Sequence, residues 1–383
     1  IQARSCKIHL TASTDRREVL SDATIVICTI GVGGRRAWEQ DVFIPRKYGI
    51  YQPVGDSVMP GGTSRALRMI PAMVDIAKDV LELAPKALFF NYGNPMAPVC
   101  RGVRKATGAN MIGLCHGVFH VGQYLAEALG VEAGELEYTA MGMNHLTWFT
   151  EMRVKGQDVI DRLEKFADEQ IAKVSRSESS PAEVNLFTWS LFKLIKAFPA
   201  VRDRHVTEFF PHLFSRLKSY YGVTLGVEAY SFENTIARGD QIFDQMRQDA
   251  LSEKPLEDEY FKAVGGEHEQ VMEIIESIRQ DKNRIFSANL PNHGQIPNLP
   301  IDSIVECPVV VNSSGLHAIM QKPLPVAAAG VLATRLMWVE TVVEAALEGS
   351  RDKFVQALLL DGAVTSFEMA EKLADELLEV QSA

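Results

Sequence analysis

The sequence predicts an α/β protein with a doubly wound parallel sheet, followed by a second domain of mixed strands and helices. In the first third, short apolar runs alternate with longer segments of helical periodicity, a pattern typical of right-handed βαβ units. From Glu137 the sequence becomes β-rich through Val154, and mostly helical segments follow. We therefore place a boundary near residue 140, which gives domains 1–140 and 141–383.

Two strands are predicted before the first long helix. Lys7 to Ser13 alternates polar and apolar residues, and Ala23 to Ile30 is a β-branched apolar run that stops at Gly31-Val32-Gly33-Gly34. A helix is expected from about Gly62 to Leu83, since apolar residues recur on one of its faces. The glycine run Gly31 to Gly34 marks the end of the second predicted strand.

The alternation continues with a buried strand, a helix and another strand. These are Ala87 to Asn91, Pro95 to Thr107, and Asn110 to Leu114. In the second domain, a long connection is expected from Asn289 to Pro300, and two or three helices from Pro325 to Gln381.

Composition favours a small-molecule enzyme. The formal net charge of -10 and pI near 5.5 argue against nucleic-acid or anionic-membrane partners, which select clustered Lys and Arg. No apolar run is expected to reach the ~18 residues of a membrane span. Five cysteines without a CxxC pair suggest neither a disulfide framework nor a structural zinc site, so we expect a soluble cytoplasmic protein.

Residues that can bind ligands follow four consecutive strands. In open α/β sheets, ligands bind beyond the carboxyl ends of the strands. Gly31 to Gly34, Asn91 to Pro95, Cys115 to Val118 and Gly142 to His145 occupy these positions. Taken alone, the glycine run could equally be a plain turn, and Asn94-Pro95 is also a common turn initiator.

Cys115 and His145 are more specific candidates. A thiolate and an imidazole on neighbouring strand ends could bind a divalent transition metal with open positions. A lone Cys is more often a small buried hydrophobe, and a lone His is more often structural. Only the pairing of Cys115 and His145 at strand ends favours a functional role for these two residues.

The run Arg202-Asp203-Arg204-His205 has two interpretations. It is either a solvated ion-pair patch or a carboxylate kept ionised as a base by flanking cations. The residues alone favour the patch.

Taken together, these segments resemble glycoside hydrolase family 4 over essentially the whole chain. The matching segments are Thr14-Asp15-Arg16, the Thr29 to Gly34 strand exit, Ile44 to Gly49, Pro60 to Gly62 with Arg65 to Arg68, Asn91 to Pro95, Gly113 to His116, Gly142 to His145, Asp203 to His205, and Asn292 to Pro300. The resemblance implies an NAD-binding Rossmann-like domain over 1–140 and a catalytic α+β domain over 141–383 that resembles the C-terminal domain of lactate and malate dehydrogenases.

The resemblance also implies NAD-dependent elimination in place of two-carboxylate hydrolysis. The sugar loses a hydride from C3 to NAD and a proton from C2 to a base, the glycosidic oxygen leaves, water adds, and the hydride returns. A divalent metal, usually Mn²⁺, stabilises the enolate through the sugar oxygens.

Carried onto this sequence, the resemblance makes Cys115 and His145 the metal ligands and Asp203 the C2 base, and it places His116 where some relatives carry the acid that protonates the leaving group. For the run Arg202 to His205, the resemblance therefore favours the ionised base over the solvated ion-pair patch. The implied NAD-contacting residues are Gly31, Val32, Gly33 and Asn94, and the implied substrate contacts are Asp56, Arg65, Asn94, His116, Asn144 and Arg204.

Cys115-His116-Gly117-Val118 looks more like the α-galacturonidase branch of the family than the phospho-glycosidase branches, so we expect an α-linked uronate as substrate. A homodimer or homotetramer is expected. The family begins with a strand, a Gly-x-Gly-Ser turn and a second strand, which this sequence lacks, so its sheet would lack two strands and the chain is expected to be part of a longer protein. Two rival interpretations stay open: a 2-hydroxyacid dehydrogenase, which needs no metal thiolate, and a non-catalytic truncated homologue.

Overall fold

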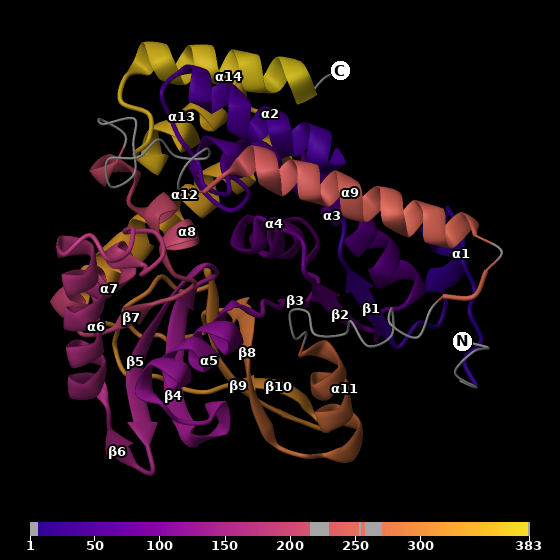
Figure 1. Cartoon of the computed structure of the whole chain (residues 1–383). Helices are drawn as coiled ribbons and strands as arrows, with labels where there is room; N and C mark the ends of the chain where they lie inside the picture. The colour runs from indigo at the N-terminus through magenta and orange to yellow at the C-terminus, as the bar shows by residue number, and fades with distance from the viewer. Residues whose placement is uncertain (1–6, 215–229, 253, 257–269, 382–383) are drawn as a thin grey trace.

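The computed structural model describes residues 7–214, 230–252, 254–256 and 270–381. Within them one ten-stranded sheet runs through both predicted domains, in the order β1-β2-β3-β8-β9-β4-β5-β6, with β10 paired to β9 and β7 to β5 (Figure 1). The strands are β1 (Ile25–Cys28), β2 (Leu88–Asn91), β3 (Met111–Gly113), β4 (Leu136–Met143), β5 (Leu146–Val154), β6 (Gln157–Asp158), β7 (Phe198–Pro199), β8 (Arg284–Pro291), β9 (Ile304–Asn312) and β10 (Gly315–Ala318).

The sheet changes from parallel to antiparallel where β3 meets β8. Strands β1, β2 and β3 are parallel, and β8 joins β3 antiparallel through the pair Gly113 and Asn289. The antiparallel part continues through β9, β4 and β5. Because β3 ends at this junction, the residues that follow it face both halves of the molecule.

Helices cover the sheet and connect its strands. They are α1 (Arg16–Leu20), α2 (Gly34–Lys47), α3 (Met59–Leu83), α4 (Met96–Thr107), α5 (Gly117–Leu129), α6 (Ile160–Ser175), α7 (Leu186–Ile195), α8 (Asp203–Val206), α9 (Phe232–Leu251), α11 (Val271–Gln280), α12 (Val326–Glu348), α13 (Arg351–Asp361) and α14 (Phe367–Gln381). Helix α4 packs against α3 at Gly102, where an added Cβ would lie 2.7 Å from Ile70 Cγ2. Glycine therefore allows the close approach of these two helices.

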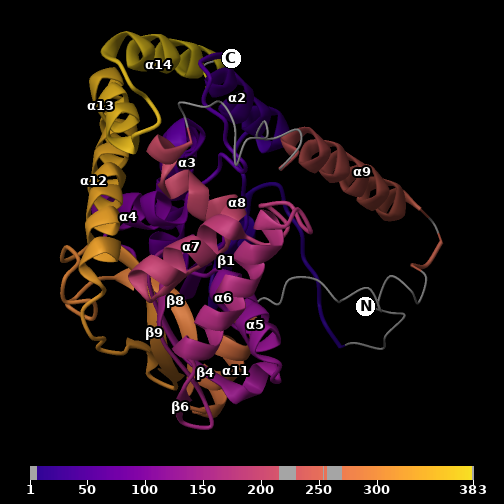
Figure 2. The same cartoon turned by 60° about the vertical axis from the view of Figure 1, so that its left-hand side comes forward.

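The three C-terminal helices close one side of the molecule. Helix α12 packs against α3, α4 and α13, as Figure 2 shows. By length and apolarity it is the one helix among the described residues that could cross a membrane, so the expectation that no segment reaches this length was wrong. Half of its most apolar stretch is buried within the fold, and its buried Arg335 pairs with buried Asp361 at 2.8 Å. These contacts identify α12 as a core helix.

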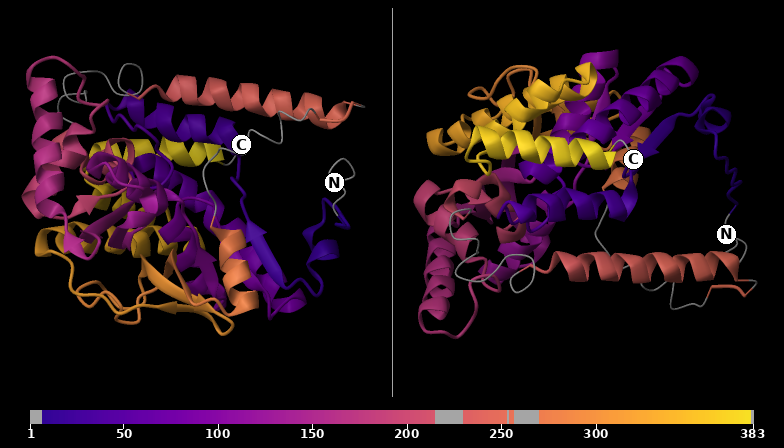
Figure 3. Two further views of the ribbon diagram at one scale, coloured as in Figure 1. Left: turned by 60° about the horizontal axis from the view of Figure 1, so that its bottom comes forward. Right: turned by 90° about the horizontal axis from the view of Figure 1, so that it is seen from above.

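Helix α9 lies alongside α2 (Figure 3). Phe232, at its start, packs edge-on against Trp38 with ring centroids 5.0 Å apart, and Arg35 and Arg36 of α2 pair with Asp240. This contact fixes the start of α9 against the first domain.

Most predicted elements of the first domain are confirmed. The second predicted strand is β1, the predicted helix 62–83 is α3, and the next three elements are β2, α4 and β3. The C-terminal helices are confirmed as α12, α13 and α14. The division at residue 140 stays a prediction, because the sheet is continuous across it.

The strand predicted over 7–13 is wrong. This segment forms no strand, and Ile8 and Leu10 are 62% and 74% exposed. A strand needs a hydrogen-bonding neighbour, and no described strand pairs with this segment. The connection expected from Asn289 begins later, since β8 continues to Pro291.

Candidate active site

Two cavities meet at Cys115, His116 and His145. The first, the strand-end cavity, measures about 510 Å³, and its other lining residues are Ile27, Thr29, Tyr92, Asn94, Met96, Leu114 and Val271. The second, the histidine cavity, measures about 530 Å³, and its other lining residues are Gly117, His120, Val121, Ala182, Glu183, Asn185, Val201, Arg202, Arg204, His205 and Tyr230. Three residues predicted from the sequence thus form the wall that both cavities share.

Cys115 and His116 lie between β3 and α5. The Cys115 Sγ accepts a hydrogen bond from the Gly117 N–H at 3.3 Å. A Cβ on Gly117 would lie 2.3 Å from Val201 Cγ1, so this position requires glycine. The His116 ring lies 4.8 Å from that of His120, which places two imidazoles along α5 at the cavity.

His145 occupies the turn between β4 and β5 with φ of 65°. Its Nδ1 lies 2.8 Å from the Ser57 Oγ, and that hydroxyl donates its hydrogen to the Asp56 Oδ1, also at 2.8 Å. Because a hydroxyl has a single hydrogen, Nδ1 must donate to Ser57, which leaves the lone pair on Nε2. The imidazole is therefore in the tautomer that a metal ligand at Nε2 requires.

The potential ligand atoms of Asp56, His145 and His205 all lie within 4.8 Å of one another. Burial lowers the pKa of His145, and burial together with the neighbouring His145 holds the pKa of His205 well below its usual range. Burial raises the pKa of Asp56, but nearby cationic groups, Arg65 foremost, outweigh it and leave that pKa below its usual range. Neutral imidazoles beside an ionised carboxylate form a donor set suited to a divalent transition metal.

His205 was not assigned as a ligand from the sequence, although it belongs to the run singled out there. The predicted partner Cys115 is not a member of this three-residue group, but it lines the same cavities as His145. The sequence could not show that His145 and His205 lie together, because their meeting point depends on how the loop carrying Asp56 folds.

Asn94, Asp56 and Arg65 form a chain of hydrogen bonds across the sheet edge. The Asn94 Nδ2 donates to Asp56 Oδ2 at 3.0 Å, and Arg65 Nε donates to the Asn94 carbonyl at 3.0 Å. An added Cβ on Gly31 would lie 3.4 Å from an Arg65 nitrogen, and Gly33 has φ of 79°. The turn Gly31-Val32-Gly33 thus lies next to Arg65, which contacts Asn94 on the wall of the strand-end cavity. Glycines at this strand end would let the backbone approach a dinucleotide closely.

Asp203 is fully buried, so the solvated-patch interpretation is wrong. Its two carboxylate oxygens accept the backbone N–H groups of Phe187 and Thr188 at 3.1 and 2.7 Å, at the start of α7. It does not line either cavity, and its role as the C2 base stays a prediction. Arg204 lines the histidine cavity and donates to Thr235 Oγ1 at 3.0 Å.

Asn144 precedes His145 in the β4–β5 turn; it is buried and lines neither cavity. Its Nδ2 donates to Glu306 Oε2 at 3.1 Å, and Ser287 donates to Glu306 Oε1 at 3.3 Å. Burial raises the pKa of Glu306 to about 7. A second buried carboxyl, Glu208, accepts the N–H groups of Val54 and Gly55 at 2.9 and 2.8 Å, and burial raises its pKa to about 8.

The sequence did not predict a role for Glu306 or Glu208. A Glu inside an apolar strand or beside aromatic residues gives no sign of the groups that it contacts. Glu306 holds the turn that carries His145, and Glu208 holds the loop that carries Asp56. Glu306 and Glu208 therefore fix the backbone segments that carry His145 and Asp56.

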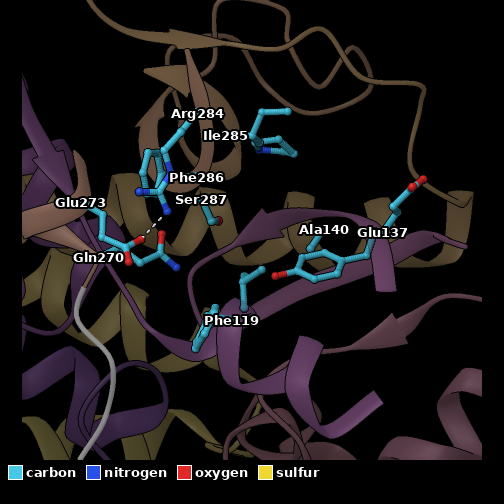
Figure 4. A pocket seen from close by; sticks show the side chains of 12 residues that line it. Phe119, Glu137, Ala140, Gln270, Glu273, Arg284, Ile285, Phe286 and Ser287 are labelled. Carbon is cyan, nitrogen blue, oxygen red and sulfur yellow. Dashed lines mark hydrogen bonds and ion pairs between the residues drawn. The ribbon is translucent and has the colours of Figure 1, made fainter. Parts of the chain in front are cut away.

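A third cavity of about 400 Å³ lies away from this site, between α5, β4, α11 and β8 (Figure 4). Its walls are mainly apolar, and Arg284 on its rim already donates to Glu273 at 2.9 Å. It brings together no group of metal-ligating side chains in the described part of the chain. The chemistry therefore belongs to the first two cavities.

A model of the "Family 4 glycosyl hydrolase" domain matches residues 1–131, and one of the "Family 4 glycosyl hydrolase C-terminal domain" matches residues 140–364. An alpha-galactosidase from Rhizobium meliloti is 31% identical, over 100% of this chain and 78% of the relative. An alpha-galacturonidase from Bacillus subtilis is 30% identical, over 95% of this chain and 82% of the relative.

Among solved structures, a 6-phospho-alpha-glucosidase from gut microorganisms in complex with NAD and Mn²⁺ has the same fold. Its TM-score is 0.77 at 20% identity, with 97% of this chain and 84% of that chain covered. The predicted α/β fold class is thereby confirmed.

Replacing Asp203 by Asn tests its place at the start of α7. Asn keeps one acceptor where the carboxylate has two, so we expect the free energy of unfolding to fall by about 1–2 kcal/mol in urea denaturation. Asp161→Asn, an exposed position in the first turn of α6, is the control and should change stability little. Unchanged stability of Asp203→Asn with loss of C2 proton exchange would instead favour the role of base.

Replacing Glu306 by Gln should change how stability depends on pH. The pKa of Glu306 rises from 4.5 to about 7 on folding, so its stabilising contribution is complete below about pH 4.5 and is lost as the pH rises through about 7. The loss is at most about 3 kcal/mol. Urea denaturation between about pH 5 and pH 8 should therefore show a smaller decline for Glu306→Gln than for the wild type. Exposed Glu137→Gln is the control, and parallel curves for wild type and Glu306→Gln would contradict this.

Proposed function

Since the chain belongs to family 4 of the glycosyl hydrolases, we propose that it cleaves α-glycosides, specifically α-galacturonides, with NAD and a divalent metal such as Mn²⁺. The observation that carries the proposal is the meeting of two cavities at Cys115, His116 and His145. A redox cofactor in one cavity and a sugar in the other would face each other across the metal-ligating residues.

The strand-end cavity suits the nicotinamide part of the dinucleotide. It opens at the carboxyl ends of β1 and β2, next to the Gly31 turn, where doubly wound sheets bind dinucleotides. When bound, NAD would accept and return a hydride, and the metal would act as a Lewis acid on the sugar oxygens. Asn94 lines this cavity, and its amide is fixed by Asp56.

The histidine cavity suits the sugar. Cys115 and His145 would hold the metal from the shared wall, and His116 would deliver a proton to the leaving group from the same wall. Asn144 is engaged by Glu306, so its contribution is to hold the His145 turn. Arg65 contributes by fixing the Asn94 backbone.

An anionic sugar is supported by two arginines in the histidine cavity. Arg202 and Arg204 both line it, and the Arg204 Nε is buried without a hydrogen-bond partner among the described residues. A uronate carboxylate would supply that partner. The α-galacturonidase relative agrees with this assignment, while the α-galactosidase relative favours an uncharged galactoside as the alternative.

The thiol of Cys115 favours a reducing compartment, and Cys28, Cys100 and Cys307 are also free cysteines rather than disulfides in the described part of the chain. We propose a cytoplasmic homodimer or homotetramer. The rival interpretation as a non-catalytic homologue predicts no NAD binding, which isothermal titration with NAD would decide.

The proposal predicts that p-nitrophenyl α-galacturonide is cleaved only in the presence of NAD, Mn²⁺ and a reductant. In D₂O the product should carry deuterium at C2, because the reaction removes that proton, and NMR would detect it. The matched α-galactoside should be the poorer substrate. Cleavage that persists after chelation and removal of NAD would contradict the mechanism, and preference for the galactoside would contradict the substrate.

Cys115→Ser should lose nearly all activity at saturating NAD, because a serine hydroxyl is a poor metal ligand compared with a thiolate. Steady-state rates against Mn²⁺ concentration would measure this. Cys100→Ala, a buried cysteine of α4 outside both cavities, is the control. Full activity of Cys115→Ser would contradict the metal assignment.

A further inference from the structure

The three side chains of Asp56, His145 and His205 converge from separate parts of the chain. Asp56 lies in the loop before α3, His145 in the β4–β5 turn and His205 in α8, and their ligand atoms lie within 4.8 Å of one another. We propose that His205 and the Asp56 carboxylate are further protein ligands of the divalent metal that Cys115 and His145 would hold. The inference rests on the metal dependence in the proposed function and extends the metal site to two residues outside the predicted Cys115 and His145 pair.

One nitrogen of the His205 ring has no hydrogen-bond partner among the described residues. This nitrogen, Nδ1, is buried. The ring centroid lies 4.3 Å from that of His145. A buried ring nitrogen without a partner costs free energy, and coordination of a metal would recover it.

Ser57 sets the orientation of the other two ligands. Its hydroxyl accepts from His145 Nδ1 and donates to Asp56 Oδ1, so one residue fixes both side chains from outside the group. Metal sites commonly fix their ligands in this way, through hydrogen bonds to the atoms that do not bind the metal. The His145 Nε2 and the remaining lone pairs of Asp56 are then available to a cation.

The charges around the group favour a cation as its ligand. The group offers one carboxylate, from Asp56, and two imidazoles, from His145 and His205. Arg65 acts on Asp56 as a fixed positive charge, and it also donates to the Asn94 carbonyl. Two imidazoles and one carboxylate suit Mn²⁺, Zn²⁺ or Fe²⁺ better than Mg²⁺, which prefers oxygen ligands.

The alternative role for His205 is proton transfer to or from the sugar, since it also lines the histidine cavity. The two roles differ in one measurable respect. A ligand contributes to Mn²⁺ affinity in the absence of substrate, whereas a proton-transfer residue does not.

The test measures Mn²⁺ binding to the full chain without sugar. Electron paramagnetic resonance detects this binding as a loss of the free Mn²⁺ signal. Removing a residue that hydrogen-bonds to a metal ligand typically costs about 10–100-fold in metal affinity, so loss of a ligand in His205→Ala should weaken Mn²⁺ binding by about 100-fold or more. Added imidazole should restore part of the affinity by occupying the space left. His120→Ala is the matched control, because His120 lines the same cavity but is not in the group.

The outcomes separate the two proposals. His145→Ala must lose Mn²⁺ binding if the site exists. If His145→Ala loses it while His205→Ala binds Mn²⁺ like the wild type, the role of His205 is overturned and the proposed function stands. If the wild type binds no Mn²⁺, the proposed function fails as well. Far-ultraviolet circular dichroism establishes that each variant is folded, and His205→Gln, which keeps most of the side-chain volume, replaces His205→Ala if the latter does not fold.

Discussion

The hydrogen bonds of Ser57 hold the two halves of the site together. Its hydroxyl joins Asp56, in the loop before α3, to His145, in the turn between β4 and β5. Glu208 fixes the backbone of the first segment, and Glu306 fixes the second through Asn144. Among the described strands the parallel and antiparallel parts of the sheet meet at β3 and β8, so these side-chain contacts help to decide where the metal-ligating atoms lie.

Sequence reasoning recovered the parts of the fold that depend on local pattern. The β-branched run of β1 and the apolar face of α3 predict their own structures. Cys115 and His145 line the same two cavities, as expected, but the expectation that they follow neighbouring strands was wrong, because β8 and β9 lie between β3 and β4 in the sheet. The strand predicted over 7–13 was wrong, because alternating polar and apolar residues form a strand only when a neighbouring strand pairs with them. His205 and Glu306 could not be assigned, since His145 and Asn144, the residues they meet at the site, lie far from them along the chain.

Burial determines the electrostatics of the site. It raises the pKa values of Glu208 and Glu306 toward neutrality and lowers those of His145 and His205, so the groups around the shared wall carry less charge than their types suggest. Asp56 is the exception: burial by itself raises its pKa, but the charge of Arg65 is the largest of the effects that outweigh burial and leave that pKa below its usual range.

The central claim is that the metal binds where the two cavities meet. Anomalous diffraction at the manganese absorption edge, from crystals grown with Mn²⁺ and NAD, tests this directly. The account predicts a peak within about 2.3 Å of the His145 Nε2, a distance typical of metal–nitrogen bonds. A peak elsewhere, with none beside His145, would contradict it.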